Sequence, residues 1–272
     1  MNVDAKTILC ATIANPNRAT KSPIMHNAGF EALGINYVYM AFEPKDLAGA
    51  LNAMRVLDIK GFSVSKPYKE EVIKYLDEID EIAQKIGAVN TVHNINGKLK
   101  GYNSDWIGAA TALQEITELG RKRVFIVGAG GAGRAIAYGL KTENANVTIF
   151  DRTKERAEKV AAELGVEYGG GLDTLIEKNY DILVNATSVG FYPNVNETIF
   201  PKSFLVKDKV VLDVVFNPAE TRLIREAREA GCKVALGIRM LTLQGAFQFK
   251  LFTGQNAPID VMQKALEDAL LT

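Results

Sequence analysis

The chain is poor in the residue types that build metal, redox and disulfide sites. Among its 272 residues there are two cysteines, Cys10 and Cys232, and two histidines, His26 and His93. Neither cysteine belongs to a CxxC or Cys/His pattern, and neither histidine has a metal-ligating partner near it in the sequence. We therefore expect two structural thiols and no bound metal.

An excess of charge of either sign is also missing. Lys and Arg together number 32, as do Asp and Glu, so no net field attracts nucleic acid or an anionic membrane surface. No apolar stretch approaches the roughly 20 residues of a membrane-spanning helix, and the first residues include Asp4 rather than a long apolar signal segment. We expect a cytoplasmic protein without a nucleic-acid or membrane partner.

Short apolar runs alternate with longer helical patterns, which is typical of an α/β protein. At 47% hydrophobic residues the chain can bury a sizeable core. The first hundred residues predict strands at 6–14, 35–42 and 58–65, helices at 22–34 and 44–57, two short acidic helical segments up to residue 85, and a hairpin over 88–103 that turns at Asn96-Gly97. These elements make an α/β unit of ordinary domain size.

A glycine-rich turn opens the second half of the chain. After a helix expected over 105–119, a buried strand at 124–127 leads into Gly128, Gly130 and Gly133, which have GxGxxG spacing. The next strand ends at Asp151, a suitable distance for an acid to reach the adenosine ribose. Further strands are expected at 180–190, 209–216 and 232–237. The order of these features predicts a Rossmann, doubly wound dinucleotide-binding domain rather than an unrelated glycine-rich turn.

Eight motifs in a fixed order then resemble a known family. They are TKSPIMHN, SVSKPYKE, GAVNT, GYNSD, GAGGAGRA, DRT, NATSVG and GIRMLTLQGAFQFKLFTG. Together they cover nearly the whole chain and resemble the shikimate dehydrogenases and their quinate dehydrogenase relatives. The resemblance implies reversible hydride transfer between NAD(P) and a ring hydroxyl of a cyclic hydroxy acid. It implies an N-terminal α/β substrate domain at 1–104, the Rossmann domain at 105–237, and C-terminal helices at 238–272 that return to the substrate domain.

The resemblance implies a catalytic role for Lys69 and Asp105. Without the resemblance, we would interpret Lys69 as a solvated surface charge and Asp105 as the cap of the helix that follows Ser104. A carbonyl that accepts a hydride develops negative charge on its oxygen and needs a proton donor or cation nearby. We expect Lys69 to exchange a proton with the substrate, and Asp105 to hold the lysine ammonium and the same hydroxyl.

The substrate-binding residues carry over with two departures. Thr20 and Ser22 stand where the family has two serines that hold the carboxylate, although both hydroxyls could instead cap the helix that begins at Pro23. The other ligands that match the family are Ser65, Asn90 and Gln244.

The departures are Ser63 in place of an asparagine and Phe216 in place of a frequent tyrosine. Each removes a hydrogen-bonding group, and Ser63 also frees volume that could admit the additional hydroxyl of quinate. The choice between shikimate, quinate and both is therefore left open.

Cofactor binding is expected from the ends of several strands. The residues that the resemblance assigns to it are Gly128, Gly130, Gly131, Ala132, Gly133, Asp151, Arg152, Thr187, Ser188, Val214 and Gly237. At Asp151 the NADP-specific members generally have asparagine. A carboxylate there would bond the ribose hydroxyls of NAD and repel a 2′-phosphate, although Arg152 and Arg156 could receive such a phosphate. We expect NAD to be favoured, with NADP possible.

Other classes of protein were weighed against this one. A glutamyl-tRNA reductase would need a thiol nucleophile and a basic RNA surface, and Cys10 and Cys232 lie outside every motif above. A non-catalytic redox sensor that binds NAD(H) would have the same glycine-rich loop as a dehydrogenase. A plain binding module for aromatic-pathway acids would have the same substrate-binding residues. The presence of both Lys69 and Asp105 favours an enzyme, either a monomer or a homodimer.

Overall fold

The computed structural model describes residues 3–16, 20–175 and 179–271. The chain forms two compact units, Met1–Ser104 with Gln244–Thr272, and Asp105–Leu243. The division between them at Leu243 and Gln244 lies inside helix α8 (Gly237–Thr253). The expected C-terminal segment 238–272 therefore begins within this helix.

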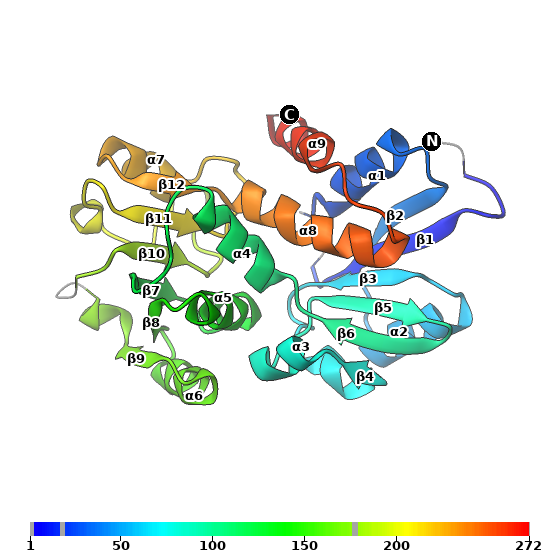
Figure 1. Cartoon of the computed structure of the whole chain (residues 1–272), viewed down its shortest axis with the longest axis horizontal. Helices are drawn as coiled ribbons and strands as arrows, with labels where there is room; N and C mark the ends of the chain where they lie inside the picture. The colour runs from blue at the N-terminus through cyan, green and yellow to red at the C-terminus, as the bar shows by residue number, and fades with distance from the viewer. Residues whose placement is uncertain (1–2, 17–19, 176–178, 272) are drawn as a thin grey trace. The chain divides into compact units, whose positions relative to one another are not determined.

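The first unit contains a mixed sheet. Within the described residues its strand order is β2-β1-β3-β5-β6-β4 (Figure 1). The strands are β1 (Ile8–Ile13), β2 (Tyr37–Phe42), β3 (Gly61–Val64), β4 (Glu78–Ile79), β5 (Thr91–Ile95) and β6 (Lys98–Tyr102). Strand β1 pairs in parallel with β2 and β3, whereas β5 runs antiparallel to β3 and β6. The amino end of β5 consequently meets the carboxyl end of β3.

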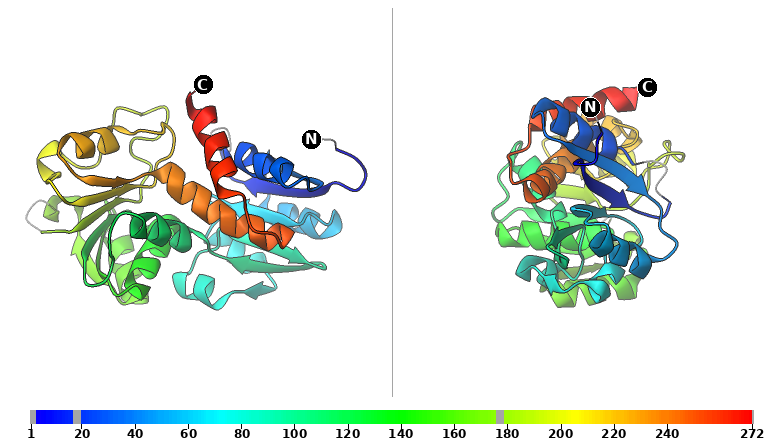
Figure 2. Two further views of the ribbon diagram at one scale, coloured as in Figure 1. Left: turned by 45° about the horizontal axis from the view of Figure 1, so that its top comes forward. Right: turned by 90° about the vertical axis from the view of Figure 1, so that its right-hand side faces the viewer.

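Helices cover this sheet. They are α1 (Ser22–Ala32), α2 (Leu47–Val56), the 3₁₀ turn η1 (Glu71–Tyr75), α3 (Glu81–Ile86), the second part of α8, and α9 (Ile259–Leu271). Pro23 lies in the first turn of α1, where its missing N–H costs no hydrogen bond. Helix α9 lies alongside α1 in each view (Figures 1 and 2). The predicted hairpin turn is confirmed, with positive φ at both Asn96 and Gly97.

The second unit is a doubly wound parallel sheet, as the glycine-rich turn predicted. Its strand order among the described residues is β12-β11-β10-β7-β8-β9, with every pairing parallel. The strands are β7 (Arg123–Val127), β8 (Asn146–Phe150), β9 (Glu167–Gly170), β10 (Ile182–Asn185), β11 (Val210–Asp213) and β12 (Lys233–Ala235). The order of strands reverses between β7 and β10, which is the position where ligands bind in such sheets.

The helices of the second unit are α4 (Asp105–Gln114), α5 (Gly131–Thr142), α6 (Lys154–Leu164), the 3₁₀ turns η2 (Leu172–Thr174) and η3 (Lys202–Phe204), α7 (Arg222–Glu229), and the first part of α8. Strands β10 and β11 are buried along their whole length, as expected for central strands of a parallel sheet. Among residues 3–16, 20–175 and 179–271, no helix is both long and apolar enough to cross a membrane.

Several elements differ from the sequence-based expectation, among them strand β4, which lies in a stretch that was expected to be helical. Helix α4 ends at Gln114 rather than at residue 119. The β-branched pair Ile116 and Thr117 follows, and both of their N–H groups donate to the Leu113 carbonyl, which closes the helix in a tight turn. Strand β9 was not predicted, because its sequence EYGG has no apolar run.

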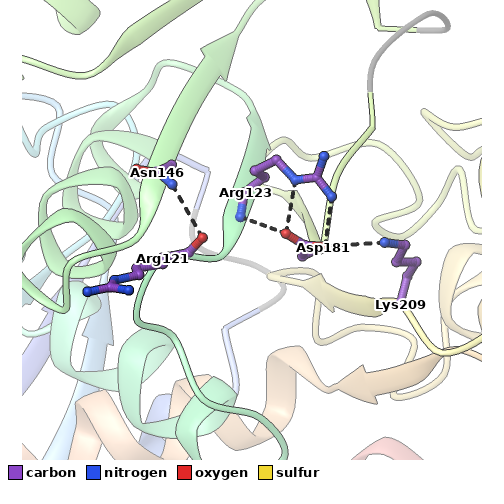
Figure 3. Close-up of polar contacts among 5 residues, drawn as sticks. All are labelled: Arg121, Arg123, Asn146, Asp181 and Lys209. Carbon is purple, nitrogen blue, oxygen red and sulfur yellow. Dashed lines mark hydrogen bonds and ion pairs between the residues drawn. The ribbon is translucent and has the colours of Figure 1, made fainter.

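An ion cluster joins the amino ends of three strands in the second unit. Asp181, just before β10, accepts hydrogen bonds from Arg123 Nε at 3.1 Å and from Lys209 Nζ at 3.2 Å (Figure 3). The Arg123 guanidinium is the main reason that the pKa of Asp181 lies well below its usual range. Arg123 begins β7 and Lys209 precedes β11. The cluster therefore connects three neighbouring strands at their amino ends, away from the carboxyl ends where ligands bind in such sheets.

Candidate active site

The expected cofactor residues of the second unit follow the carboxyl ends of its strands. Those of the glycine-rich loop come after β7, Asp151 and Arg152 after β8, Thr187 and Ser188 after β10, Val214 after β11, and Gly237 after β12. Backbone hydrogen bonds connect these loops: Ala186 N–H donates to the Val127 carbonyl at 2.8 Å, and Val214 N–H to the Asn185 carbonyl at 3.0 Å. The fold therefore gathers all of them at one edge of one sheet.

The glycine-rich loop has no room for side chains at two positions. A Cβ atom on Gly133 would lie 1.7 Å from the Gly128 carbonyl oxygen, so only glycine allows α5 to start this close to β7. Gly128 itself has φ +115°, a conformation that other residues rarely adopt. No side chain caps the amino end of α5, and Gly130 before it is extended. The N–H groups of this helix end suit the pyrophosphate of a dinucleotide.

The carboxylate of Asp151 is engaged inside the loop. Its Oδ2 accepts a hydrogen bond from Ala129 N–H at 2.7 Å, and its Oδ1 accepts one from Thr153 N–H at 2.9 Å. Asp151 thus links the glycine-rich loop to the start of α6. The residues beside it on that segment, Arg152, Lys154 and Arg156, are exposed.

A buried polar network that the sequence did not predict connects the loops after β10 and β11. The Asp213 carboxylate accepts hydrogen bonds from Asn185 Nδ2 at 2.9 Å and from Thr221 Oγ1 at 2.6 Å. Asn185 Oδ1 in turn accepts from the N–H of Thr187 at 3.0 Å. Burial raises the pKa of Asp213 to about 6. The only sequence signal was a polar residue at the end of each of two apolar strands.

In the first unit, the backbones of Ser65, Lys69 and Asn90 lie close to the carboxyl end of β3. The chain after β3 turns back on itself, with Tyr68 N–H donating to the Ser65 carbonyl at 2.9 Å. The Lys69 carbonyl accepts from Val89 N–H at 2.7 Å, and the Asn90 carbonyl accepts from Val64 N–H, also at 2.7 Å. These bonds hold the backbones of Ser65, Lys69 and Asn90 near one another.

The side chains of Asn90 and Gln244 belong to one buried cluster with Ser104. Asn90 Nδ2 donates to Ser104 Oγ at 3.0 Å and to Gln244 Oε1 at 3.4 Å. Ser104 Oγ also donates to Gln244 Oε1 at 3.2 Å, while its N–H donates to Asn90 Oδ1 at 2.8 Å. Two residues that were expected to bind ring hydroxyls are thereby held together, with their oxygen atoms turned toward protein donors.

Ser63 is hydrogen-bonded inside the first unit. Its hydroxyl accepts a hydrogen bond from the Tyr39 hydroxyl and donates one to Gln248 Oε1 at 2.6 Å. Tyr39 and Gln248 are 1% and 2% exposed, so both partners of Ser63 are buried. Neither residue was predicted, although Gln248 lies one helical turn after Gln244 and so on the same face of α8.

The hydroxyls of Thr20 and Ser22 contact each other rather than cap a helix. Thr20 Oγ1 donates to Ser22 Oγ at 3.3 Å and accepts from Ser22 N–H at 3.4 Å. Lys21 occupies the cap position of α1, and no side chain makes a capping hydrogen bond there. The capping alternative for this pair is therefore not what the structure contains.

Two further expected positions lie in the second unit. Asp105 is the first residue of α4 and is 6% exposed, so its carboxylate lies where the helix dipole favours a negative charge. Phe216 packs edge-on against Phe191, with ring centroids 5.5 Å apart.

His26 belongs to the core of the first unit. It is fully buried, and burial lowers its pKa to about 3, so it is neutral at physiological pH. Its ring stacks on that of Tyr39, with centroids 4.2 Å apart. In the part of the chain that the structure describes, no three His, Cys, Asp or Glu side chains are grouped as metal ligands.

Comparison with known protein families gives three matches along the chain. Residues 12–92 match the shikimate dehydrogenase substrate binding domain, residues 110–198 match shikimate/quinate 5-dehydrogenase, and residues 237–267 match the shikimate 5′-dehydrogenase C-terminal domain. The first match lies in the first unit, the second lies in the second unit, and the third covers the end of the second unit and most of the C-terminal part of the first.

Full-length relatives are similar to the whole chain. The shikimate dehydrogenase (NADP(+)) of Pyrococcus furiosus is 45% identical over 265 residues, which cover 96% of each chain. The shikimate dehydrogenase (NADP(+)) of Methanocaldococcus jannaschii is 44% identical over 98% of this chain and 99% of its own. A crystal structure of a shikimate dehydrogenase in complex with NADP+ superposes with a TM-score of 0.94 at 43% identity, covering 99% of this chain and 98% of that one.

These relatives overturn the expectation that NAD is favoured. Both curated relatives are named for NADP(+), and the solved neighbour contains NADP+. The expectation assumed that the Asp151 carboxylate faces a ribose, whereas both of its oxygens accept hydrogen bonds from backbone N–H groups. A carboxylate that is bonded to the backbone in this way does not indicate whether the cofactor has a 2′-hydroxyl or a 2′-phosphate.

The fold, the glycine-rich loop and the similarity over nearly the full length agree with one another. Identity above 40% over at least 96% of the chain is far beyond a shared fold alone. The chain therefore belongs to the shikimate dehydrogenase family of oxidoreductases.

Proposed function

We propose that this protein is an NADP-dependent shikimate dehydrogenase that interconverts 3-dehydroshikimate, NADPH and a proton with shikimate and NADP+. The observation that carries the proposal is the buried cluster of Asn90, Ser104 and Gln244 next to the Lys69 turn. It offers amide and hydroxyl groups near a turn that carries an ionisable lysine, as a polyhydroxylated ring undergoing proton transfer requires. The names of the relatives support the same substrate and cofactor.

Lys69 and Asp105 are the proposed catalytic residues. When bound, NADPH supplies the hydride that adds to the ketone carbon, and NADP+ accepts it in the reverse direction. Lys69 gives a proton to the ketone oxygen as that oxygen becomes a hydroxyl, and takes the proton back during oxidation. Asp105 stabilises the charged form of Lys69 and accepts a hydrogen bond from the same hydroxyl.

We propose that the first unit binds the substrate and the second binds the cofactor. In the first unit Thr20 and Ser22 hold the substrate carboxylate, while Ser65, Asn90 and Gln244 hold its ring hydroxyls. The mutual contact of the Thr20 and Ser22 hydroxyls supports this, because it keeps two hydroxyls together, and both can turn their protons to one carboxylate when the substrate replaces this contact.

In the second unit the amino end of α5 would hold the pyrophosphate, and Arg152 and Arg156 would receive the 2′-phosphate. Support comes from the uncapped helix end and from the exposed guanidinium groups beside Asp151. Thr187, Ser188, Val214 and Gly237 line the same edge of the sheet, where the family's nicotinamide end is expected.

Shikimate is the proposed substrate in preference to quinate. Quinate carries an additional ring hydroxyl, and the polar groups beside Ser63, the Tyr39 hydroxyl and Gln248 Oε1, are already hydrogen-bonded to Ser63. A buried hydroxyl without a partner would weaken quinate binding.

An initial-rate matrix of shikimate and quinate against NADP and NAD tests the proposal. We expect the highest kcat/KM for shikimate with NADP. No turnover in any of the four combinations would overturn dehydrogenase function, whereas a higher kcat/KM with quinate would overturn the choice of substrate alone.

A further inference from the structure

One continuous chain of hydrogen bonds runs through the interior of the first unit toward the proposed substrate residues. It begins at the Tyr39 hydroxyl, passes to Ser63, and continues to Gln248 Oε1 at 2.6 Å. Gln248 Nε2 donates to Thr91 Oγ1 at 3.0 Å, and the Thr91 hydroxyl donates to Asn90 Oδ1 at 2.7 Å. All five side chains are less than 9% exposed, so water does not compete for these bonds.

The chemistry of each group fixes the direction of this chain. The Asn90 carbonyl can only accept, so the Gln248 amide atom that lies 3.4 Å from it is Nε2, which also donates to Thr91. Oε1 then faces Ser63, which must donate to it. The single proton of the Thr91 hydroxyl is then directed to Asn90 Oδ1.

Asn90 Nδ2 is consequently directed at Gln244 Oε1 and Ser104 Oγ. Reversing the Asn90 amide would place its NH₂ group against the Ser104 N–H, and reversing the Gln248 amide would place its oxygen against the Asn90 carbonyl oxygen. Either arrangement is costly in a buried site.

The far end of the chain is anchored by His26 and Asn27 of α1, for which the proposed chemistry has no other use. Asn27 brackets Tyr39 on its strand: its Nδ2 donates to the Tyr39 carbonyl at 3.0 Å, and its Oδ1 accepts from Tyr39 N–H at 2.8 Å. His26 stacks on the Tyr39 ring. The backbone and the ring plane of Tyr39 are thus both fixed by adjacent residues of one helix.

We propose that Tyr39, Ser63, Gln248 and Thr91 form a positioning relay that sets which atoms Asn90 and Gln244 present to the substrate. This inference rests on the proposed function, since it assigns the relay to the same substrate site. The relay turns Gln244 Oε1 toward Asn90 and Ser104.

Removing single hydroxyls from the relay tests the proposal. Thr91→Val cuts it next to Asn90, and Tyr39→Phe cuts it at the far end. We expect Thr91→Val to raise the KM for shikimate by about 5- to 50-fold, the range for buried amides that lose a partner, with the KM for NADP changed less than about twofold. Tyr39→Phe should act in the same direction but more weakly.

Two matched variants serve as controls. Tyr37→Phe removes the hydroxyl that donates to the Phe252 carbonyl from the same strand β2, and Thr253→Val removes one that donates to the Phe249 carbonyl in α8. Both hydroxyls lie outside the relay, so neither control should change the KM for shikimate. Equal effects in relay and control variants would overturn the proposal.

A double-mutant cycle separates positioning from general destabilisation. Since the relay acts through Asn90, adding Thr91→Val to Asn90→Ala should cost less than about twofold more in kcat/KM. A full additional loss in that background would mean that Thr91 acts by another route and that the relay does not exist.

The side-chain amide resonances of Asn90 and Gln248 report on the relay without turnover. In ¹⁵N-labelled protein, Tyr39→Phe should shift both resonances and Tyr37→Phe should not. If the wild-type protein fails to oxidise shikimate with NADP, the proposed function fails, and unshifted resonances would separately show that the relay fails.

Discussion

The side-chain amide of Asn185 donates a 2.9 Å hydrogen bond to the carboxylate of Asp213, and this contact joins the ends of strands β10 and β11. Asn185 also accepts hydrogen bonds from the N–H and the hydroxyl of Thr187, at 3.0 and 2.6 Å. A single pair of buried residues therefore shapes the loop in which two cofactor residues are proposed.

The first prediction is that Asp213→Asn destabilises the second unit. An asparagine at this position would have to turn its own NH₂ group toward Thr221 or toward the donors Asn185 Nδ2 and Val215 N–H. We expect a loss of about 1–3 kcal/mol in the free energy of unfolding, the usual penalty for an unsatisfied buried polar group. Urea unfolding at neutral pH measures this, and wild-type stability in the variant would contradict it.

The second prediction concerns the pH dependence that Asp213 causes. Because its folded-state pKa is raised to about 6, the native state binds the proton more tightly than the unfolded chain does. Its favourable contribution is full below the unfolded pKa of about 4 and is lost as the pH rises through about 6.

Relative to Asp213→Asn, the wild-type protein should therefore lose stability between these pH values. The difference in Tm between the two proteins, recorded across this range, checks the sign. A difference that does not change with pH would mean that Asp213 has an ordinary pKa.

The third prediction concerns the ion cluster at Asp181. Arg123 holds the pKa of this carboxylate below its usual value, so the stabilisation is present at neutral pH and is lost as the pH falls into the acid range. Asp181→Asn should lower the free energy of unfolding by about 1 kcal/mol at neutral pH, because the groups are partly exposed.

The cluster lies at the amino ends of the strands, so the KM for NADP should not change. Asp173→Asn is the matched control, since Asp173 is more exposed than Asp181 and its carboxylate lies as far as 3.9 Å from Lys154 Nζ. If the control and Asp181→Asn are equally unstable, the cluster contributes nothing.

Local sequence signals predicted a large part of the fold because the residues that determine it are close together in the chain. Asn96-Gly97 has the conformations that a tight hairpin needs, and Gly128 to Gly133 fit only a strand-to-helix turn. The predicted end of α4 was wrong because the helical pattern of apolar residues continues past the turn that Ile116 and Thr117 form.

The polar networks could not be predicted in the same way. Ser63 contacts Tyr39, 24 residues away, and Gln248, 185 residues away, so no local pattern connects them. The interpretation of Asp151 was wrong for a related reason. The spacing of an acidic residue in the sequence does not show whether its carboxylate already accepts hydrogen bonds from backbone N–H groups.

The fourth prediction is that Arg152 and Arg156 select for NADP. Replacing both with Gln should raise the KM for NADP by about tenfold or more and change the KM for NAD little, since only NADP has the 2′-phosphate. Lys159→Gln is the control, because Lys159 is a well-exposed cation on the same helix. Equal losses for NADP and NAD would place these arginines away from the 2′-phosphate.

The last prediction concerns Lys69 and Asp105. If Lys69 exchanges the proton, Lys69→Ala should lower kcat by roughly 10² to 10⁴, while the affinity for NADP stays near its original value. Asp105→Asn should also slow turnover, and the double variant should lose much less than the product of the two single losses, because the two groups act as a unit. Lys74→Ala, an exposed lysine in η1, serves as the control. Near-normal shikimate oxidation by Lys69→Ala would show that this lysine is only a surface charge.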